Sequence, residues 1–209
     1  QNKLPFVAPV QGLPRLEDAK LAAPTPDRSV IKFCTVCGST VTFRIPAGDN
    51  LPRHVCDQCG NIHYENPRLV VGCVAEYEKK ILLCRRAIEP RLGFWTLPAG
   101  FMENGETTAN AAMRETQEEA GAAVVIEAPF ALYSIAHIHQ VHLFYRGRLP
   151  TPHHVAGEES LEVGLFAAAD IPWKDLAFRS VKLCLERYLD DRQRGQFGFH
   201  EAELAPLRL

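Results

Sequence analysis

The 209-residue chain lacks the features that would assign it to a membrane, a secretory route or a polyanion surface. No run of about 18 apolar residues is present, which excludes a membrane-spanning helix, and no apolar segment resembles the core of a secretory signal. Lys and Arg number 23 against 25 Asp and Glu, a net charge of -2, so no basic excess supports a surface that coats a polyanion. The chain also lacks an initial Met. Because it begins with Gln1, we expect its numbering to start within a precursor that could carry a cleaved targeting segment.

The cysteines do not show the paired pattern of a disulfide scaffold, because their number is seven. Four of them are spaced C-x2-C-x18-C-x2-C, and each pair is followed by a glycine that permits a tight turn. This spacing predicts a closed, structural zinc site with four thiolate ligands; a redox dithiol and coincidence are the alternatives. The predicted zinc ligands are Cys34, Cys37, Cys56 and Cys59. The remaining Cys73, Cys84 and Cys184 lie in apolar surroundings, so we expect buried small hydrophobes rather than reactive thiols.

Three carboxylates gather in the segment 100–122. Glu115, Glu118 and Glu119 are spaced i, i+3 and i+4, so on a helix they share one face, where their charges repel. A cation between them removes this repulsion, and carboxylate oxygens favour Mg²⁺ or Mn²⁺, ions that also bind substrate phosphates. The sequence therefore predicts a metal-dependent site for a phosphate-bearing ligand, with a solvated, salt-bridged helix as the alternative.

The flanking residues are typical of a capped helix. Glu106 is expected to start the helical stretch, with Thr107 or Thr108 as its cap. Gly121 suits the position just past the helix end. Arg114 lies one turn before the second carboxylate of the cluster, from where it could orient a ligand carboxylate.

This segment resembles a Nudix box, G-x5-E-x7-R-E-U-x-E-E-x-G-U, in which U is a bulky aliphatic residue. The seven fixed positions all match: Gly100, Glu106, Arg114, Glu115, Glu118, Glu119 and Gly121. Both U positions depart from the pattern, since Thr116 and Ala122 are small, and this puts helix packing rather than chemistry in question. The resemblance implies hydrolysis of a nucleoside diphosphate linked to another moiety, in which metal ions polarise the phosphoryl oxygens and activate the attacking water.

The resemblance also implies roles for individual residues. The implied metal ligands are the carboxylates of Glu115, Glu118 and Glu119 and the carbonyl oxygen of Gly100. Glu106 is either an outer ligand or the partner that holds Arg114 in place. The general base is a box glutamate in some relatives and a glutamate on a distal loop in others. The loop candidates here are Glu158, Glu159 and Glu162, of which Glu159 and Glu162 rank first; a solvated acidic loop is the alternative.

The chain divides into three regions by composition. Residues 1–30 carry five prolines and predict an extended arm, residues 31–66 predict the zinc ribbon, and residues 67–209 predict the catalytic domain. Strands are expected at 41–45, 61–64, 69–76, 81–85, 123–126, 130–138, 141–147 and 161–166, a loop at 151–160, and a second helix at 178–191, while residues 95–99 lead into the box. The strands 69–76 and 81–85 should pair as a hairpin. Strands flanked by two helices predict an α/β fold, and the resemblance implies the Nudix α/β/α sandwich with a mixed sheet.

Segments outside the box narrow the resemblance. The zinc ribbon, GFWTLPAGFMENGE and GEESLEVGLFAAADIPWKDLAF resemble plastid Nudix hydrolases of plants and algae that act on FAD and ADP-ribose. This resemblance implies cleavage of FAD to FMN and AMP, a homodimer to whose interface the ribbon contributes, and a plastid location. Bacterial proteins share the ribbon and the box, so a bacterial cytoplasm is the alternative. The SQPWPFPxS-type array of NADH pyrophosphatases is absent, which lowers NADH as a substrate.

Other functions and contacts stay open from the sequence. A nucleic-acid enzyme is disfavoured, and no nucleic-acid partner is expected, because the charged residues of the ribbon sum to zero. A regulatory subunit without turnover is the third alternative. Phe94 and Trp95 either stack on a substrate ring or join the core, and Arg85 or Arg86 could face a phosphate. No second metal is predicted from the histidines at 137, 139, 142, 153 and 154.

Overall fold

The structure, a computed structural model, describes residues 31–206. The chain forms two compact units, which divide between Glu65 and Asn66 and are described separately. The proline-rich arm predicted for residues 1–30 lies outside the described residues. No helix in the described part of the chain combines the length and apolar character needed to cross a bilayer.

The smaller unit is a three-stranded antiparallel sheet in the order β1-β2-β3. Its strands are β1 (Val41–Arg44), β2 (Arg53–Cys56) and β3 (Ile62–His63). The sequence predicted β1 and β3 but missed β2, in which Val55 is the only aliphatic residue and the last position is a cysteine. Gly38 and Gly60 follow the two cysteine pairs and each has φ of +74°, so the predicted glycine turns are confirmed.

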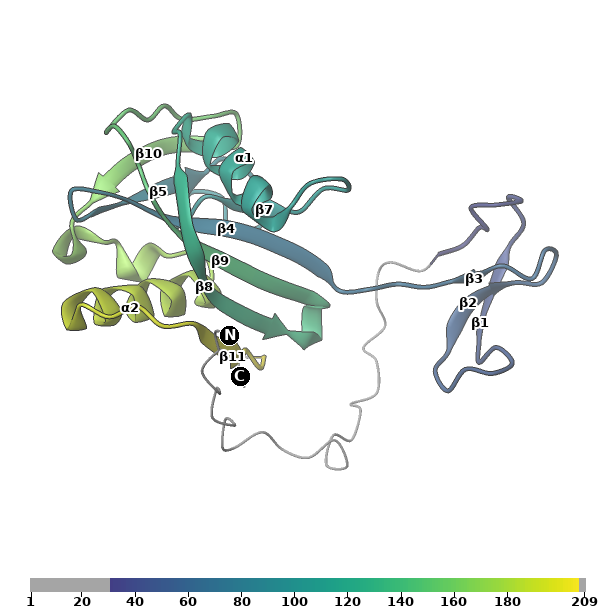
Figure 1. Ribbon diagram of the computed structural model, residues 1–209. Helices are drawn as coiled ribbons and strands as arrows, with labels where there is room; N and C mark the ends of the chain where they lie inside the picture. Colours follow the sequence, from purple (N-terminus) through teal and green to yellow (C-terminus); the bar gives the residue numbers. More distant parts are fainter. Residues whose placement is uncertain (1–30, 207–209) are drawn as a thin grey trace, which may run out of the picture. The chain divides into compact units, whose positions relative to one another are not determined.

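The larger unit is built on a mixed sheet in the order β10-β5-β4-β9-β8-β11, with β6 paired to β5 and β7 paired to β4 (Figure 1). The strand pairs β4–β9 and β8–β11 are parallel, and the others are antiparallel. The strands are β4 (Arg68–Tyr77), β5 (Lys80–Arg86), β6 (Trp95–Thr96), β7 (Ala99–Phe101), β8 (Val125–Ile135), β9 (Gln140–Arg148), β10 (Ser160–Phe166) and β11 (His200–Glu203). Short 3-10 helices occur at η2 (Ala136–Ile138), η3 (Ala168–Asp170) and η4 (Trp173–Asp175).

The predicted hairpin of β4 and β5 is confirmed. Tyr77 pairs with Lys80 across a two-residue turn. Glu78 and Lys79 have φ of 46° and 66°, the left-handed conformation at both positions that suits the twist of a tight hairpin.

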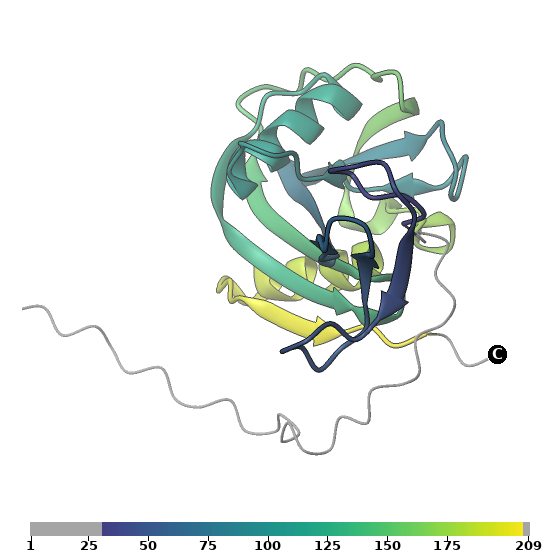
Figure 2. The ribbon, with the colours of Figure 1, turned by 90° about the vertical axis from the view of Figure 1, so that its right-hand side faces the viewer.

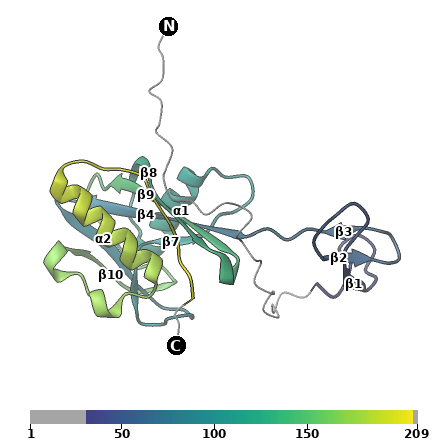
Figure 3. The ribbon, with the colours of Figure 1, turned by 90° about the horizontal axis from the view of Figure 1, so that it is seen from below.

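One helix covers each face of this sheet, as the sandwich prediction requires. Helix α1 (Thr108–Ala120) packs its alanines into one core with Cys73 of β4, whereas α2 (Arg179–Arg194) packs Leu185 into a second core with Val74. Adjacent residues of a strand point to opposite faces, so β4 supplies both cores. Figure 2 shows α1 in teal and α2 in yellow on opposite sides of the curved strands, and Figure 3 shows α2 lying across the sheet from below. The α/β/α fold is therefore confirmed.

Two strands differ from the prediction. The sequence predicted separate strands at 123–126 and 130–138, but β8 is one strand whose register shifts near Glu127 and Pro129. Proline is tolerated at such irregularities, so Pro129 does not end the strand as the sequence pattern predicted. The sequence missed strand β11, because its residues His-Glu-Ala-Glu have little apolar content and its partner β8 lies far away in the sequence.

Candidate active site and metal centre

Helix α1 places the acidic residues as the spacing predicted. The hydroxyl of Thr107 accepts a hydrogen bond from the backbone N–H of Asn110, so Thr107 is the N-cap, and Gly121 closes the helix with φ of 56°. Glu106 lies before the helix, so the expectation that it starts the helical stretch is wrong. Thr116 and Ala122, the small residues of the box, are buried with no exposed surface, which shows that the helix packs closely without bulky side chains.

Arg114 is the centre of the charge network on this helix. Its guanidinium donates to both carboxylate oxygens of Glu106, at 3.1 and 2.7 Å, and to the backbone oxygen of Phe101 at 3.1 Å. The Nη1 atom donates to Glu115 at 2.7 Å and to Glu118 at 2.9 Å. Hydrogen bonds from Arg114 hold the pKa of Glu106 below its ordinary value. Of the two roles considered for Glu106, the geometry favours the partner of Arg114.

Two carboxylates of the cluster are buried. Glu119 is 7% exposed and accepts a hydrogen bond from the backbone N–H of Ala99 at 3.2 Å; burial raises its pKa to about 8. Glu115 is 8% exposed, and burial also raises its pKa, although Arg114 opposes the shift. A Cβ atom at Gly100 would lie 2.4 Å from the carboxylate oxygens of Glu115, so a side chain there would displace this carboxylate. Two desolvated carboxylates on one helix face form an environment that favours a cation.

The donor set fits a hard divalent ion by its chemistry, since it consists of carboxylate and carbonyl oxygens. In this conformation Glu115 and Glu118 both accept hydrogen bonds from Nη1 of Arg114. Within residues 31–206, only the four cysteines bring three or more ligand atoms within 4.8 Å of one another. Binding of an ion by this set therefore requires its oxygens to lie closer together than they do in this conformation.

The predicted loop 151–160 is present, and it lies against the end of α1. The N–H groups of Val155 and Gly157 donate to the carbonyl oxygens of Ala120 and Glu119, at 2.8 and 3.1 Å, so the loop satisfies carbonyls that a helix end leaves free. The N–H of Ala87 donates to the carbonyl oxygen of Glu159 at 2.8 Å and fixes the loop at its other end. The loop thus holds Glu159 between the end of α1 and the end of β5.

The two preferred candidates for the general base separate in space. Glu159 and its neighbour Glu158 line the same cavity as the box carboxylates, and the charge of Glu159 helps to raise the pKa values of Glu115 and Glu119. Glu162 lies on β10 and pairs with Arg85 at 3.6 Å, and it does not line that cavity. The geometry therefore favours Glu159 over Glu162.

The cavity has a volume of about 1040 Å³ and extends from the box carboxylates to the start of β9 and of α2. Arg86, and not Arg85, lines it, with the guanidinium 5.2 Å from the ring centroid of Phe178. Phe94 and Trp95 do not line it. Trp95 packs in the core against Phe166, with ring centroids 4.8 Å apart, which supports the core alternative for that residue.

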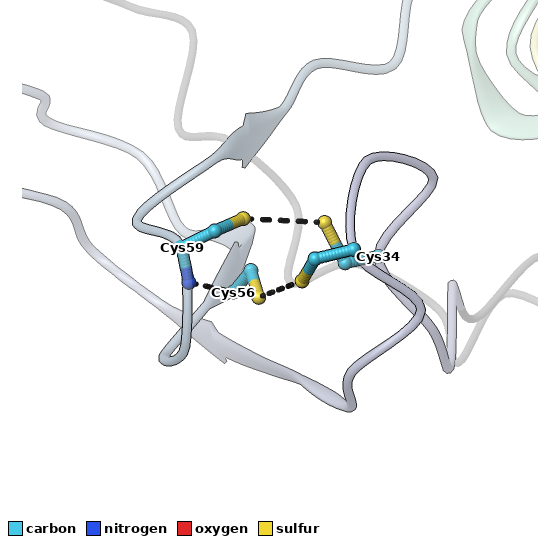
Figure 4. A group of neighbouring side chains, drawn as sticks. Cys34, Cys56 and Cys59 are labelled. Atoms are coloured by element: carbon cyan, nitrogen blue, oxygen red, sulfur yellow. Dashed lines mark hydrogen bonds between the residues drawn. The ribbon is translucent and has the colours of Figure 1, made fainter.

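The four predicted zinc ligands come together in the smaller unit (Figure 4). The Sγ atoms of Cys34 and Cys59 lie 3.6 Å apart, and those of Cys37 and Cys56 lie 3.4 Å apart. Zn–S bonds of about 2.3 Å in a tetrahedron place sulfurs about 3.8 Å apart, whereas a disulfide needs about 2.05 Å. The cluster therefore fits one zinc ion. The other three cysteines are buried, as expected, and burial raises their pKa values and makes them poor nucleophiles.

Comparison with known families assigns both units. The family described as Nudix N-terminal matches residues 32–65, and the NUDIX domain family matches residues 66–183. The chain belongs to the Nudix hydrolase family. A crystal structure of a Nudix hydrolase from Nitrosomonas europaea is 50% identical, with a TM-score of 0.82, and the match covers 84% of this chain and 100% of that chain.

Two curated relatives match shorter parts of this Nudix protein. The NAD-capped RNA hydrolase NudC of Photobacterium profundum is 34% identical over 89 residues, which is 43% of this chain and 32% of NudC. The ADP-ribose pyrophosphatase of Methanocaldococcus jannaschii is 38% identical over 71 residues, which is 34% of this chain and 42% of that protein. The matches thus span 32% and 42% of the length of these two relatives.

Several residues that line the Nudix cavity were not singled out by the sequence. Gln140 and Ser180 belong to no motif, and Phe178 only ends a segment that carries the resemblance; they share the cavity because the start of α2 packs against β9. The sequence predicts no role for His142, which also lines the cavity. No local sequence pattern predicts that these residues of β9 and α2 lie together.

Proposed function

We propose that this chain is a divalent-metal-dependent pyrophosphatase that hydrolyses a nucleoside diphosphate linked to another moiety. The main support is that one cavity joins the carboxylates of the Nudix box to a part lined by uncharged and apolar side chains. A dinucleotide needs both kinds of surface, because its pyrophosphate is anionic and its rings are planar and largely apolar.

We propose the following roles for the residues of the site. The carboxylates of Glu115, Glu118 and Glu119, with the carbonyl of Gly100, would hold Mg²⁺ or Mn²⁺. Such ions polarise phosphoryl oxygens and lower the pKa of the attacking water. Glu159 would take the proton of that water as general base, since it lies at the acidic part of the cavity on a fixed loop.

Two contacts would stabilise this arrangement. Arg114, held by Glu106, orients the carboxylates of the box. Arg86 would face a phosphate, since it is the arginine of the pair at the end of β5 that lines the cavity. A guanidinium is suited to phosphate because its N–H groups match the geometry of the oxygens.

The substrate we favour is FAD, with ADP-ribose as a second one. Attack of water on one phosphorus breaks the P–O–P bridge and gives FMN and AMP from FAD, or AMP and ribose 5-phosphate from ADP-ribose. The ADP-ribose pyrophosphatase among the relatives supports the second substrate. The resemblance to plastid enzymes supports the first, and with it we propose a homodimer and a plastid location, the bacterial cytoplasm being the alternative compartment.

A second candidate is hydrolysis of NADH or of an NAD-type cap on RNA. It is supported by the match to NudC, which is 34% identical over 89 residues. Against it, the charged residues of the ribbon balance, so the ribbon offers no basic face to a nucleic acid. A regulatory role without turnover is disfavoured because all seven fixed residues of the box are present.

The test is a substrate panel of FAD, ADP-ribose, NADH and NAD-capped RNA, assayed with Mg²⁺ and Mn²⁺ by comparing kcat/KM. We expect turnover that depends on the metal and is highest with FAD or ADP-ribose. Glu119→Gln should lower kcat at least about 100-fold, whereas Glu186→Gln, an exposed site on α2, should leave it unchanged. Full activity of Glu119→Gln would refute the proposal, and preference for NADH or capped RNA would establish the second candidate.

A further inference from the structure

Away from the box, the cavity is lined by three polar side chains linked by hydrogen bonds, Gln140, His142 and Ser180, which we call the relay. Nδ1 of His142 lies 3.0 Å from Oγ of Ser180, and Nε2 lies 3.0 Å from Oε1 of Gln140. All three residues line the cavity, and they come from β9 and from the first turn of α2. None of them has a role in the chemistry proposed above.

The two neighbours of His142 determine which atoms of the relay donate and which accept. Burial lowers the pKa of His142 to about 4, so the ring is neutral at neutral pH, with one nitrogen as donor and the other as acceptor. A carboxamide oxygen can only accept, so Nε2–H donates to Gln140 and Nδ1 accepts from the hydroxyl of Ser180. The relay therefore fixes the side-chain amide of Gln140 by its oxygen. Within residues 31–206, its NH₂ group has no hydrogen-bond partner.

The distance from the box suits the length of a nucleotide. His142 of β9 pairs with Val70 of β4, which pairs with Phe101 of β7, next to Gly100 at the box. Two strand spacings separate His142 from this end of β7, about 10 Å. A nucleotide bound with its phosphate at the carboxylates would reach the relay with its ring.

The surroundings of the relay suit a planar ring. Ile135, Val181 and Leu204 line the cavity in the same region, and each of them is nine-tenths or more buried. Ring faces gain from contact with such aliphatic side chains, whereas ring nitrogens and carbonyls need a polar partner when they leave water.

We propose that this region is the ring subsite, in which the Gln140 amide donates a hydrogen bond to an acceptor atom on the edge of the substrate's nitrogen heterocycle. His142 and Ser180 are positioning residues that hold the amide in place. The inference rests on the proposed function for the identity of the substrate. Adenine and the flavin ring share the chemistry required, a planar heterocycle with acceptor atoms on its edge.

Equilibrium binding tests the subsite without requiring turnover. Calorimetric titration of the full chain with AMP, FMN and ribose 5-phosphate compares ligands that share a phosphate and differ in the ring. We expect the wild-type protein to bind AMP or FMN more tightly than ribose 5-phosphate. Gln140→Leu should weaken binding of the ring-bearing ligand about five- to tenfold, the loss of one hydrogen bond, and leave ribose 5-phosphate unchanged.

Two further variants keep the test specific. Gln140→Glu retains the size and the acceptor for His142 but offers no donor, so it should weaken binding as much as Gln140→Leu. Gln193→Leu, at an exposed site on α2, is the matched control and should have no effect. A loss with AMP alone identifies adenine as the occupant, and a loss with FMN alone identifies flavin; both support the subsite.

Equal binding of all three ligands by the wild type, or unchanged affinities in Gln140→Leu, would overturn the inference. These outcomes are distinct from failure of the proposed function, in which the ligands bind with the expected preference but no member of the substrate panel is hydrolysed. A thermal melt of each variant shows whether it is folded, and Ser180→Ala, which removes one hydroxyl, provides a milder change with a loss of about threefold.

Discussion

Substitution of Gly157 by alanine tests whether the loop after β9 places the general base. A Cβ atom at this position would lie 1.8 Å from the backbone oxygen of Glu118 and 3.3 Å from Cα of Glu119. These are backbone atoms of α1, which cannot rotate away. To reach an ordinary contact of 3.4 Å, the loop must move by roughly 1.6 Å, and it carries Glu159 two residues further on.

The expected effect is mainly on turnover. A displacement of about 1 Å in a reacting group lowers the rate about 100-fold, so Gly157→Ala should reduce kcat by about that factor while KM changes little. The protein should remain folded. The backbone hydrogen bonds that hold the loop contribute about 1 kcal/mol each, against a total of about 5–15 kcal/mol for a domain of this kind.

The assay measures kcat and KM with the preferred substrate of the panel, in four proteins: wild type, Gly157→Ala, Glu159→Gln and the double variant. Glu159→Gln removes the proposed base and should itself lower kcat at least about 100-fold. In that background Gly157→Ala should cause little further loss, because there is no base left to misplace. Gly198→Ala is the control, since a Cβ there meets nothing within 4 Å.

Two results would refute this reasoning. Wild-type kcat in Gly157→Ala would show that the loop does not position a catalytic group. Independent losses that multiply in the double variant would show that the glycine acts through something other than Glu159, such as the carboxylates of α1.

Three further predictions concern stability. Cys37→Ser, or removal of zinc with a strong chelator, should release one zinc per chain and unfold the smaller unit, as measured by metal analysis and circular dichroism; a ribbon that keeps its structure without zinc would contradict the assignment. Burial lowers the pKa of His142 from 6.5 to about 4, so between these pH values the unfolded chain binds more protons than the folded one. The contribution of His142 to the free energy of unfolding should therefore be fully present above pH 6.5 and be lost, by about 3 kcal/mol, as the pH falls to 4. Urea titrations should show this fall in the wild type and a smaller fall in His142→Gln. Asp191 is 1% exposed and accepts hydrogen bonds from the Gly198 amide at 2.9 Å and from His200 at 2.8 Å. Asp191→Ala should therefore destabilise the protein by about 3 kcal/mol, as measured by thermal melts. An unchanged melting temperature would disprove a structural role for this residue.

The parts of the fold that the sequence predicted depend on local patterns. The box helix was found because caps and charge spacing lie within about 20 residues, and the zinc cluster because its ligands come in two short pairs. The hairpin of β4 and β5 has its turn directly between its strands. By contrast, β11 pairs with β8, about 70 residues earlier in the chain, and its own four residues give no strand pattern.

The residues of the candidate site also divide into those that a local pattern predicts and those that depend on the fold. The residues of the box followed from spacing, but the choice of Arg86 over Arg85 depends on which side of β5 faces the cavity, and the choice of Glu159 over Glu162 depends on how the loop before β10 lies against α1. Adjacent residues of a strand point to opposite faces, so an error of one position exchanges them. The relay of Gln140, His142 and Ser180 joins two elements that are 38 residues apart at His142 and Ser180, and no motif connects them.

The contacts of Arg114 have a consequence for how the two metal centres of this protein differ. Its positive charge already offsets much of the repulsion among the glutamates around it, so the catalytic half can acquire its native shape with no divalent ion in solution. Chelation of magnesium should then silence the enzyme reversibly and leave its melting temperature nearly unaltered. We therefore expect the metal of the ribbon to be needed for folding and the metal of the box to be needed only for turnover.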